Sequence, residues 1–459
     1  MTIWQPNPKI IQHQSPNQVI ILYRGFSELI NGDQVIEGKS YIQISWYPHP
    51  TITVKFIYHG EDRTELGKVD LKLTELFPQT RIKVHFSGAT YYGTGKNEFF
   101  GYLAEPLRRG EVENLSSLTF YIPNFYWFDV FVNDDDYENM EAEIDKNENS
   151  NRLESWLSIG CFDGQFIFTY QNWRIYLSAL EGGFELEEKL DAQGGYGVNH
   201  ICMMKRLDNR KFNLNEAYEI IEAFIYYLSF VRGFWVAPLF VKGYDSEGNQ
   251  ILEEWRIPTI KASSWLSGNY SWCYIDSTEI IDTFPGFMKK WQDQTWREVI
   301  KNSIQWYIES FTHQNGYNTS IILIQSALEN LSWIYLSGNN FISPGSFQKL
   351  TVDDKIRLLI KSLQIELLPM SEEWEAIKLA KKHGWISTWL DSINLIGQIR
   401  NLIVHPKVNQ KDNRVILTET IMSEVFQVGH YYLQQCLLKL FEYPFEENDN
   451  FQDDDEEAE

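Results

Sequence analysis

The sequence predicts an α+β protein of several domains, with an antiparallel β-rich domain, either a sandwich or a barrel, in its N-terminal half and an all-α bundle in its C-terminal part. Up to about residue 200, runs rich in β-branched and aromatic residues alternate with Gly, Asn, Asp and Pro at hairpin-like intervals. From about residue 213 the apolar residues recur with the period of a helix. The 459 residues are enough for two or three separate cores.

Residues 1–212 form the predicted β-rich domain, which we expect to sense a trigger or bind a ligand. Its clearest strand is TITVKFIYH at residues 51–59. There Ile52, Val54, Phe56 and Tyr58 alternate with Lys55 and the threonines, so one face is expected in the core and the other in solvent.

Several other side chains of this domain suit a ligand as well as a structural role. Aromatic rings stack on bases and sugars, but they also fill β cores. Arg108 and Arg109, placed in a loop after Pro106, are candidates for a phosphate or partner contact, with plain solvation as the alternative. The aromatic candidates are Tyr91, Tyr92, Phe125, Tyr126, Trp127 and Phe128.

Residues 213–275 are predicted to join the two main parts through a helix and a β-hairpin. The helix is expected to start at a cap formed by Asn213 or Asn215 and to end at Gly233. A dense basic cluster precedes it and is a candidate patch for RNA or a phage-derived ligand, with a solvated linker as the alternative. The cluster consists of Lys205, Arg206, Arg210 and Lys211.

Residues 276–445 are predicted to form a bundle of about six helices, followed by an acidic, disordered tail at 446–459. The stretch GQIRNLIVHP, from Gly397 to Pro406, closes the penultimate long helix. Leu390, Ile393, Ile396 and Ile399 precede or lie in it with a spacing of three, which predicts one buried face.

This stretch contains the predicted catalytic residues, Arg400, Asn401 and His405. Pro406 disfavours helical geometry at His405, so we expect the side chains of Arg400 and His405 to face one pocket at the helix end. A histidine can move protons at the 2′-hydroxyl or the leaving 5′-oxygen of RNA, and a guanidinium can hold the phosphate whose charge grows in the transition state. The structural alternative is that Arg400 pairs with an acidic neighbour and that His405 caps the helix.

Four further residues are predicted to support this chemistry. Lys355, Arg357 and Lys407 are candidates for guiding the phosphate backbone toward the motif. Glu329, on an apolar helix, is a candidate buried carboxylate that pairs with Arg400 or orients His405, with a position on the polar edge of its helix as the alternative.

Composition and missing motifs exclude several classes of protein. The net charge of −23 argues against a protein that coats nucleic acid through overall attraction. Widely spaced Cys161, Cys202, Cys273 and Cys436 indicate reduced thiols and no zinc site, and we expect neither a cofactor nor a metal. The sequence has no GxxxxGK[ST], GxGxxG after a strand, HExxH or GxSxG motif. Without a signal-like N-terminus or a long apolar run, the expected location is the cytoplasm, with no membrane partner.

The C-terminal third resembles a HEPN domain, on the evidence of RNLIVHP closing the penultimate long helix and of an earlier helix that reads SALENL. Together with the β-rich half, it resembles the ApeA-type HEPN proteins of bacterial defence against phage. The resemblance implies a metal-independent endoribonuclease in which the Arg and His of two protomers meet across a two-fold interface. By the same resemblance, Arg400 contacts phosphate, Asn401 supports the site and His405 is the acid or base.

Two main hypotheses follow for the function. The first is an endoribonuclease of anti-phage defence, of the abortive-infection or toxin type, which acts on transfer or messenger RNA as a homodimer and responds to a phage trigger or an antitoxin. The second is a non-catalytic binding protein whose bundle only dimerises. A glycan-binding β domain is a third hypothesis, suggested by the aromatic residues alone, since no convincing pair of carboxylates accompanies them.

Overall fold

The computed structural model describes residues 15–60, 67–76, 80–92, 95–126, 165–256, 258–267, 271–273, 278–311, 316–384, 391–405 and 416–444. The chain divides into two units, Met1–Ser277 and Thr278–Glu459. The predicted acidic tail at 446–459 lies outside the described residues, as do the acidic stretch 133–149 and Trp127, Phe128, Cys161, Leu390 and Lys407.

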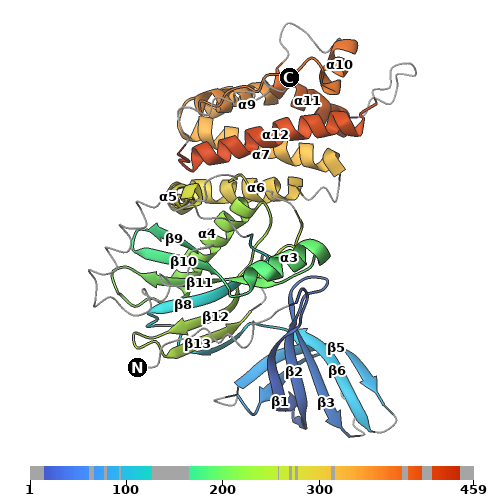
Figure 1. Ribbon diagram of the computed structural model, residues 1–459, viewed down its shortest axis with the longest axis vertical. Helices are drawn as coiled ribbons and strands as arrows, with labels where there is room; N and C mark the ends of the chain where they lie inside the picture. Colours follow the sequence, from blue (N-terminus) through green and yellow to red (C-terminus); the bar gives the residue numbers. More distant parts are fainter. Residues whose placement is uncertain are drawn as a thin grey trace, which may run out of the picture. The chain divides into compact units, whose positions relative to one another are not determined.

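The first unit opens with a closed six-stranded antiparallel barrel, which confirms the predicted β-rich architecture (Figure 1). Its strands run in the order β1-β2-β3-β6-β5-β4. Along its strands, side chains that face the core alternate with side chains that face solvent. In β3 the alternating residues Ile52, Val54, Phe56 and Tyr58 are all buried, as predicted. The strands are β1 (Ile20–Asn31), β2 (Gln34–Ser45), β3 (Thr51–His59), β4 (Lys68–Leu73), β5 (Thr80–Tyr91) and β6 (Lys96–Leu103).

A second antiparallel sheet of seven strands follows, in the order β7-β13-β12-β8-β11-β10-β9. It shares a hydrophobic core with the barrel through residues such as Tyr196 and Trp255, and the ring of Tyr196 stacks on Trp46 of the barrel at 5.6 Å. The strands are β7 (Leu107–Gly110), β8 (Ser117–Pro123), β9 (Gln165–Tyr170), β10 (Trp173–Ala179), β11 (Val198–Arg206), β12 (Leu239–Tyr244) and β13 (Gln250–Trp255).

The hairpin that we expected between the two main parts of the chain is built into this sheet, because β12 pairs with β8 and β13 pairs with β7. The expected joining helix is α4 (Leu214–Arg232), which is capped by Asn213 and ends at Gly233 with a φ of 77°. Phe224 of α4 packs against Phe168 of β9 with ring centroids 5.0 Å apart. The segment 213–275 therefore completes the second sheet and its core, and a short helix α3 (Gly183–Gln193) contacts β11.

Arg108 and Arg109 lie on edge strand β7 and not in a loop, and both are ion-paired. The register of β7 and β13 places Arg108 opposite Glu254 and Arg109 opposite Glu253. Arg108 Nη2 lies 3.0 Å from Glu254 Oε1, and Arg109 Nε donates to Glu253 Oε2 at 3.0 Å. These arginines therefore attach the edge strand to its neighbour and leave little charge for a phosphate.

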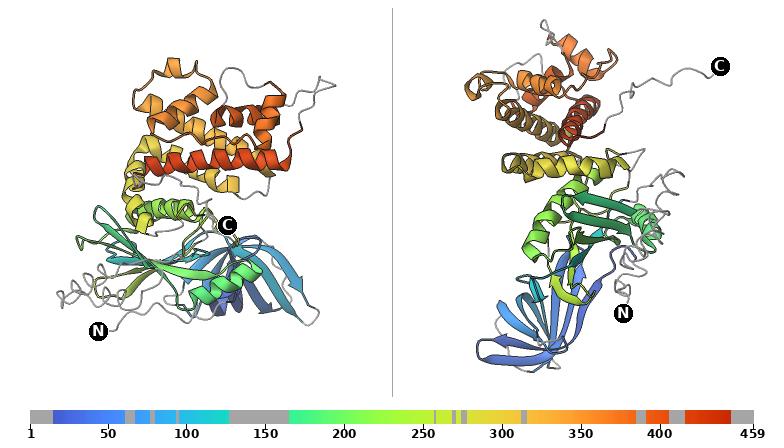
Figure 2. Two further views of the ribbon diagram at one scale, coloured as in Figure 1. Left: turned by 45° about the horizontal axis from the view of Figure 1, so that its top comes forward. Right: turned by 90° about the vertical axis from the view of Figure 1, so that its left-hand side faces the viewer.

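The second unit is helical, as predicted, and its described part contains α5 to α12. The long α12 lies against α7 near the centre of the unit (Figure 2). The helices are α5 (Thr278–Gln292), α6 (Gln294–Phe311), α7 (Gly316–Gly338), α8 (Pro344–Phe347), α9 (Val352–Ser362), α10 (Glu375–Lys382), α11 (Ser392–Val404) and α12 (Glu419–Leu440).

Candidate functional site

The helix that carries the motif is α11, and its sequence explains both of its ends. Asp391 caps the N-terminus by accepting a hydrogen bond from the backbone N–H of Asn394. Ile393, Ile396 and Ile399 are buried, as the spacing of three predicts. At the C-terminus His405 leaves helical geometry, with φ −123° and ψ 66°, directly before Pro406.

The C-terminal turn of α11 presents the predicted catalytic residues at the surface. Asn401 and His405 are exposed, Arg400 is half-buried, and Val404 is 38% exposed. The Arg400 guanidinium donates through Nη1 to Asn401 Oδ1 at 3.3 Å. The side chains are thus accessible to a nucleic acid strand in a single chain.

Arg400 and His405 do not contact each other within the described part of the chain. The His405 N–H still donates to the Asn401 carbonyl at 2.8 Å, so helical geometry holds up to that nitrogen. Positions five apart on a helix point about 140° away from each other. No described hydrogen bond joins the two side chains, and His405 itself has non-helical dihedral angles, so the shared pocket that we expected from Pro406 stays a prediction.

The structural alternative was that Arg400 pairs with an acidic neighbour and that His405 caps the helix. Of these two roles, the structure shows the one for His405. His405 is the C-terminal cap residue of α11. The described residues provide no acidic partner for Arg400, whose hydrogen bond goes to the Asn401 side chain. Arg400 is therefore a cation that no described carboxylate neutralises, which keeps it available for an anionic ligand.

Glu329 and Lys355 form an ion pair with each other and not with the motif residues Arg400 and His405. Lys355 Nζ on α9 lies 2.8 Å from Glu329 Oε1 on α7, and the Glu329 side chain is 39% exposed. The Lys355 ammonium also lies over the Phe347 ring, 4.9 Å from its centroid. The structure thus places Glu329 on the polar edge of its helix, with Lys355 in the place where we expected Arg400.

A groove of 540 Å³ surrounds this ion pair, between α6, α7, α8 and α9. Trp306 and Trp333 contribute aromatic surface and Asn330 contributes an amide. Because the charges of Glu329 and Lys355 cancel, the groove has no free cation for a phosphate. Sequence analysis missed this groove, since its residues come from four helices with no common spacing.

Arg357 is held at the opposite end of α11 from the motif. Its guanidinium donates to both carboxylate oxygens of Asp391, at 2.7 and 3.1 Å, and to Asp354 at 2.6 Å. Asp391 and Arg400 are nine residues apart, which corresponds to about 13 Å along the helix axis. We had expected Arg357 to guide a phosphate toward the end of α11. Its guanidinium is instead held by carboxylates at the start of this helix, which it stabilises.

Asp353 is a second carboxylate at the contact between α9 and α11. Burial raises its pKa above the ordinary value of 3.8, and Asn394 donates to its Oδ2 at 2.9 Å. It lies against Gly397, where an added Cβ would come within 2.2 Å of Asp353 Oδ1. A larger residue at position 397 would therefore force the Asp353 carboxylate to move.

The basic cluster before α4 is partly neutralised as well. Arg206 binds Asp208 through two hydrogen bonds, at 2.8 and 2.6 Å, and these bonds lower the pKa of Asp208 to about 2. Lys205 lies over the Tyr176 ring, while Arg210 is 81% exposed. The cluster therefore offers less free charge than its sequence indicates.

The described residues contain no group of three or more His, Cys, Asp or Glu side chains placed to hold a metal ion. Cys202, Cys273 and Cys436 are buried free thiols, and burial raises the pKa of Cys202 and Cys436. A search of the described helices finds none that could cross a membrane.

Comparison with known proteins finds two family models and a curated relative. Residues 110–266, which hold most of the second sheet, match the YopA central domain, and residues 293–453 match the YopA C-terminal domain. Neither description names a HEPN domain, so that resemblance stays a prediction.

The chain is 26% identical over 288 residues to the SPbeta prophage-derived uncharacterized protein YopA of Bacillus subtilis (strain 168), a match that spans 61% of this chain and 61% of the relative. No solved structure matches. The chain is thus similar in two of its parts to YopA, a protein carried by a prophage.

Proposed function

We propose that this protein is a metal-independent endoribonuclease whose site is completed when two chains associate through the C-terminal end of α11. The single observation that carries the proposal is that Arg400 and His405 are both accessible at the C-terminal end of α11 while no described carboxylate pairs with Arg400. No described hydrogen bond joins the two side chains within one chain. Two chains related by a two-fold axis can place Arg400 of one chain opposite His405 of the other.

In the proposed site His405 transfers protons and Arg400 neutralises the phosphate. The imidazole accepts the 2′-hydroxyl proton or protonates the leaving 5′-oxygen, a role suited to a group that titrates between pH 5 and 8. The guanidinium donates paired hydrogen bonds to the phosphoryl oxygens as their charge grows. Asn401, already hydrogen-bonded to Arg400, fixes the orientation of the guanidinium.

Substitution of the motif tests this proposal directly. Arg400→Ala and His405→Ala proteins should lose RNA cleavage by the purified protein in the presence of EDTA, while thermal unfolding stays unchanged because both residues are at the surface. Phe341→Ala, a substitution at a 64% exposed position of the helical unit, is a matched control that should cleave normally. Equal cleavage by the parent protein and the double-Ala protein would reject the catalytic assignment.

A role in conflict with phage is compatible with the prophage origin of the relative. In this setting the parent protein should arrest growth of its host when it is expressed or triggered, and the double-Ala protein should not. Transfer and messenger RNA from arrested cells would reveal the substrate as discrete cleavage products.

The second candidate function is a non-catalytic binding protein whose bundle only dimerises. It is favoured by one observation, the neutralisation of Lys355 by Glu329 and of Arg357 by Asp391, which removes two expected phosphate contacts. Under this function the double-Ala protein should keep its full cellular activity. Dimerisation would then be the property lost when the exposed surface of α11 is changed.

A further inference from the structure

One outer face of the barrel carries a row of alternating cationic and aromatic side chains. The strand register places Arg24 of β1 opposite Tyr41 of β2, Tyr41 opposite Lys55 of β3, and Lys55 opposite Phe100 of β6. Directly opposed residues of antiparallel strands lie within about 5.5 Å of each other. The four side chains therefore form one line across four neighbouring strands, drawn in blue in Figure 1.

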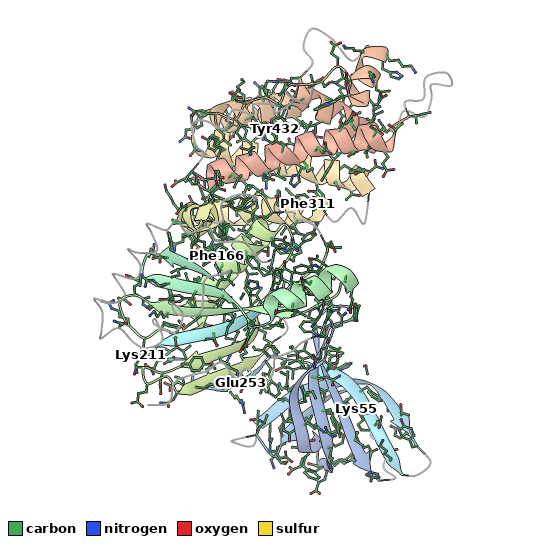
Figure 3. The ribbon with its side chains drawn as sticks, in the orientation of Figure 1. Lys55, Phe166, Lys211, Glu253, Phe311 and Tyr432 are labelled. Carbon is green, nitrogen blue, oxygen red and sulfur yellow. The ribbon has the colours of Figure 1, made fainter. Side chains whose placement is uncertain are left out.

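The side chains of this row are in contact with one another. The Arg24 guanidinium lies 5.3 Å from the centroid of the Tyr41 ring, and the Lys55 ammonium lies 5.3 Å from the centroid of the Phe100 ring. Phe100 is 39% exposed, and Lys55 is labelled on the barrel in Figure 3. Exposed rings and cations are thus interleaved at the spacing of adjacent strands.

The two neighbouring rows also carry exposed aromatic side chains, and one of them adds a cation. On one side, Lys39 lies 5.0 Å from the centroid of the Phe26 ring, which is 59% exposed. On the other side, Tyr102 is 42% exposed and packs against His85 with ring centroids 5.2 Å apart. We call the seven residues Arg24, Phe26, Lys39, Tyr41, Lys55, Phe100 and Tyr102 the barrel face.

The barrel face is positively charged although the whole chain has a net charge of −23. A single buried carboxylate, Glu98, adjoins it and is shared by Lys55 at 2.8 Å and Lys96 at 2.7 Å, and these hydrogen bonds lower the pKa of Glu98. Within the described residues no carboxylate pairs with Arg24 or Lys39. The barrel face itself thus contains three cations and no carboxylate. The opposed residues Glu28 and Glu37 mark its border, where Glu28 is paired with Lys72 at 2.9 Å.

We propose that the barrel face binds single-stranded RNA, with bases stacked on Tyr41, Phe100 and Tyr102 and phosphates held by Arg24, Lys39 and Lys55. Sequence-tolerant binding of single strands uses this combination of ring platforms and a cationic track. Only unpaired bases offer their flat surfaces for stacking, so duplexes are excluded. The choice of RNA over DNA rests on the proposed function, whereas the stacking chemistry is common to both.

The experiment measures binding separately from cleavage. Fluorescence anisotropy with end-labelled oligo-U and oligo-A is recorded on the full-length Arg400→Ala/His405→Ala protein, which keeps the RNA intact. Changing Tyr41 and Phe100 to Thr preserves strand propensity at outward positions and removes two ring platforms. We expect the affinity to fall by about tenfold or more, since each stacked base contributes on the order of ten- to a hundredfold.

Charge variants and controls complete the test. Arg24→Gln with Lys39→Gln should reduce the slope of log affinity against log salt by about 0.7 for each lost phosphate contact. Arg81→Gln, at an exposed position of β5 outside the barrel face, is a control for the loss of one cation and should bind like the parent.

Three results would overturn the proposal: no binding of any single strand at low salt, unchanged affinity in the Tyr41→Thr/Phe100→Thr protein, or equal affinity for double-stranded RNA. Tighter binding of the matching DNA strand would overturn the assignment to RNA. A failure of the proposed nuclease would appear differently, as intact RNA with the parent protein while binding by the barrel face persists.

Discussion

The separation of Arg400 and His405 on α11 predicts a specific pattern of complementation between inactive variants. Helical geometry holds up to the His405 nitrogen, whose N–H donates to Asn401 at 2.8 Å, and no described hydrogen bond joins the two side chains. In the proposed site each catalytic centre takes Arg400 from one chain and His405 from the other. We therefore expect a mixed dimer of the Arg400→Ala and His405→Ala chains to cleave RNA although neither parent dimer does.

The expected magnitude follows from counting sites in a two-fold dimer. In the mixed dimer one site loses both groups and the other keeps both, so the rate per dimer should be about half that of the unsubstituted dimer. Each parent variant should fall to about one hundredth or less, since a positioned proton donor contributes on the order of 10²–10⁴-fold and a transition-state donor on the order of 10²–10³-fold.

The assay uses two affinity tags so that only mixed dimers are isolated, followed by initial rates of RNA cleavage. The decisive control is a mixed dimer of one unsubstituted chain with one Arg400→Ala/His405→Ala chain. Each of its sites then lacks one group, so it should be inactive. Activity in this control, together with none in the mixed dimer of single variants, would refute the shared site and assign both groups to one chain.

Three further predictions concern stability. Arg357→Ala should destabilise the helical unit by about 3 kcal/mol, because Asp391 is left buried without its partner, and calorimetry should show this with no change in RNA affinity. Asp353→Asn should raise the melting temperature at pH 7. Burial raises the pKa of Asp353, so the folded state gains from its protonation, and the advantage of the variant should shrink as the pH falls toward 3.8. Arg109→Ala should cost about 1–2 kcal/mol through Glu253, and hydrogen exchange should show fraying limited to edge strand β7.

The spacing of apolar residues and the positions of helix-capping residues predicted those parts of the fold that depend on local sequence. The buried face of β3, the ends of α4 at Asn213 and Gly233, and the buried stripe of α11 all follow from patterns within about 20 residues. The closed barrel and the incorporation of β12 and β13 into the second sheet depend on pairings between distant strands, such as Arg108 with Glu254. No local pattern encodes such a pairing.

The candidate site shows the same limit at the level of side chains. Exposure of His405 and the end of α11 could be predicted from Pro406, because a helix rarely continues through the residue before a proline. The ion pairs of Lys355 with Glu329 and of Arg357 with Asp391 could not, because their members lie 26 and 34 residues apart and belong to different elements. A charged residue read from sequence is a candidate ligand contact only until its ion pairs are known.

The barrel face illustrates why register decides what a set of residues can do. Arg24, Tyr41, Lys55 and Phe100 are spread over 77 residues, and nothing in their spacing connects them. The register of β1 with β2 shifts between Ile21 and Tyr23, beside the row, and a one-residue slip moves every side chain of a strand to the other face. The alternating row therefore exists only in the folded barrel. Because phosphate attraction falls off within about 10 Å at 0.1 M salt, such a local row can bind RNA even in a chain with a net charge of −23.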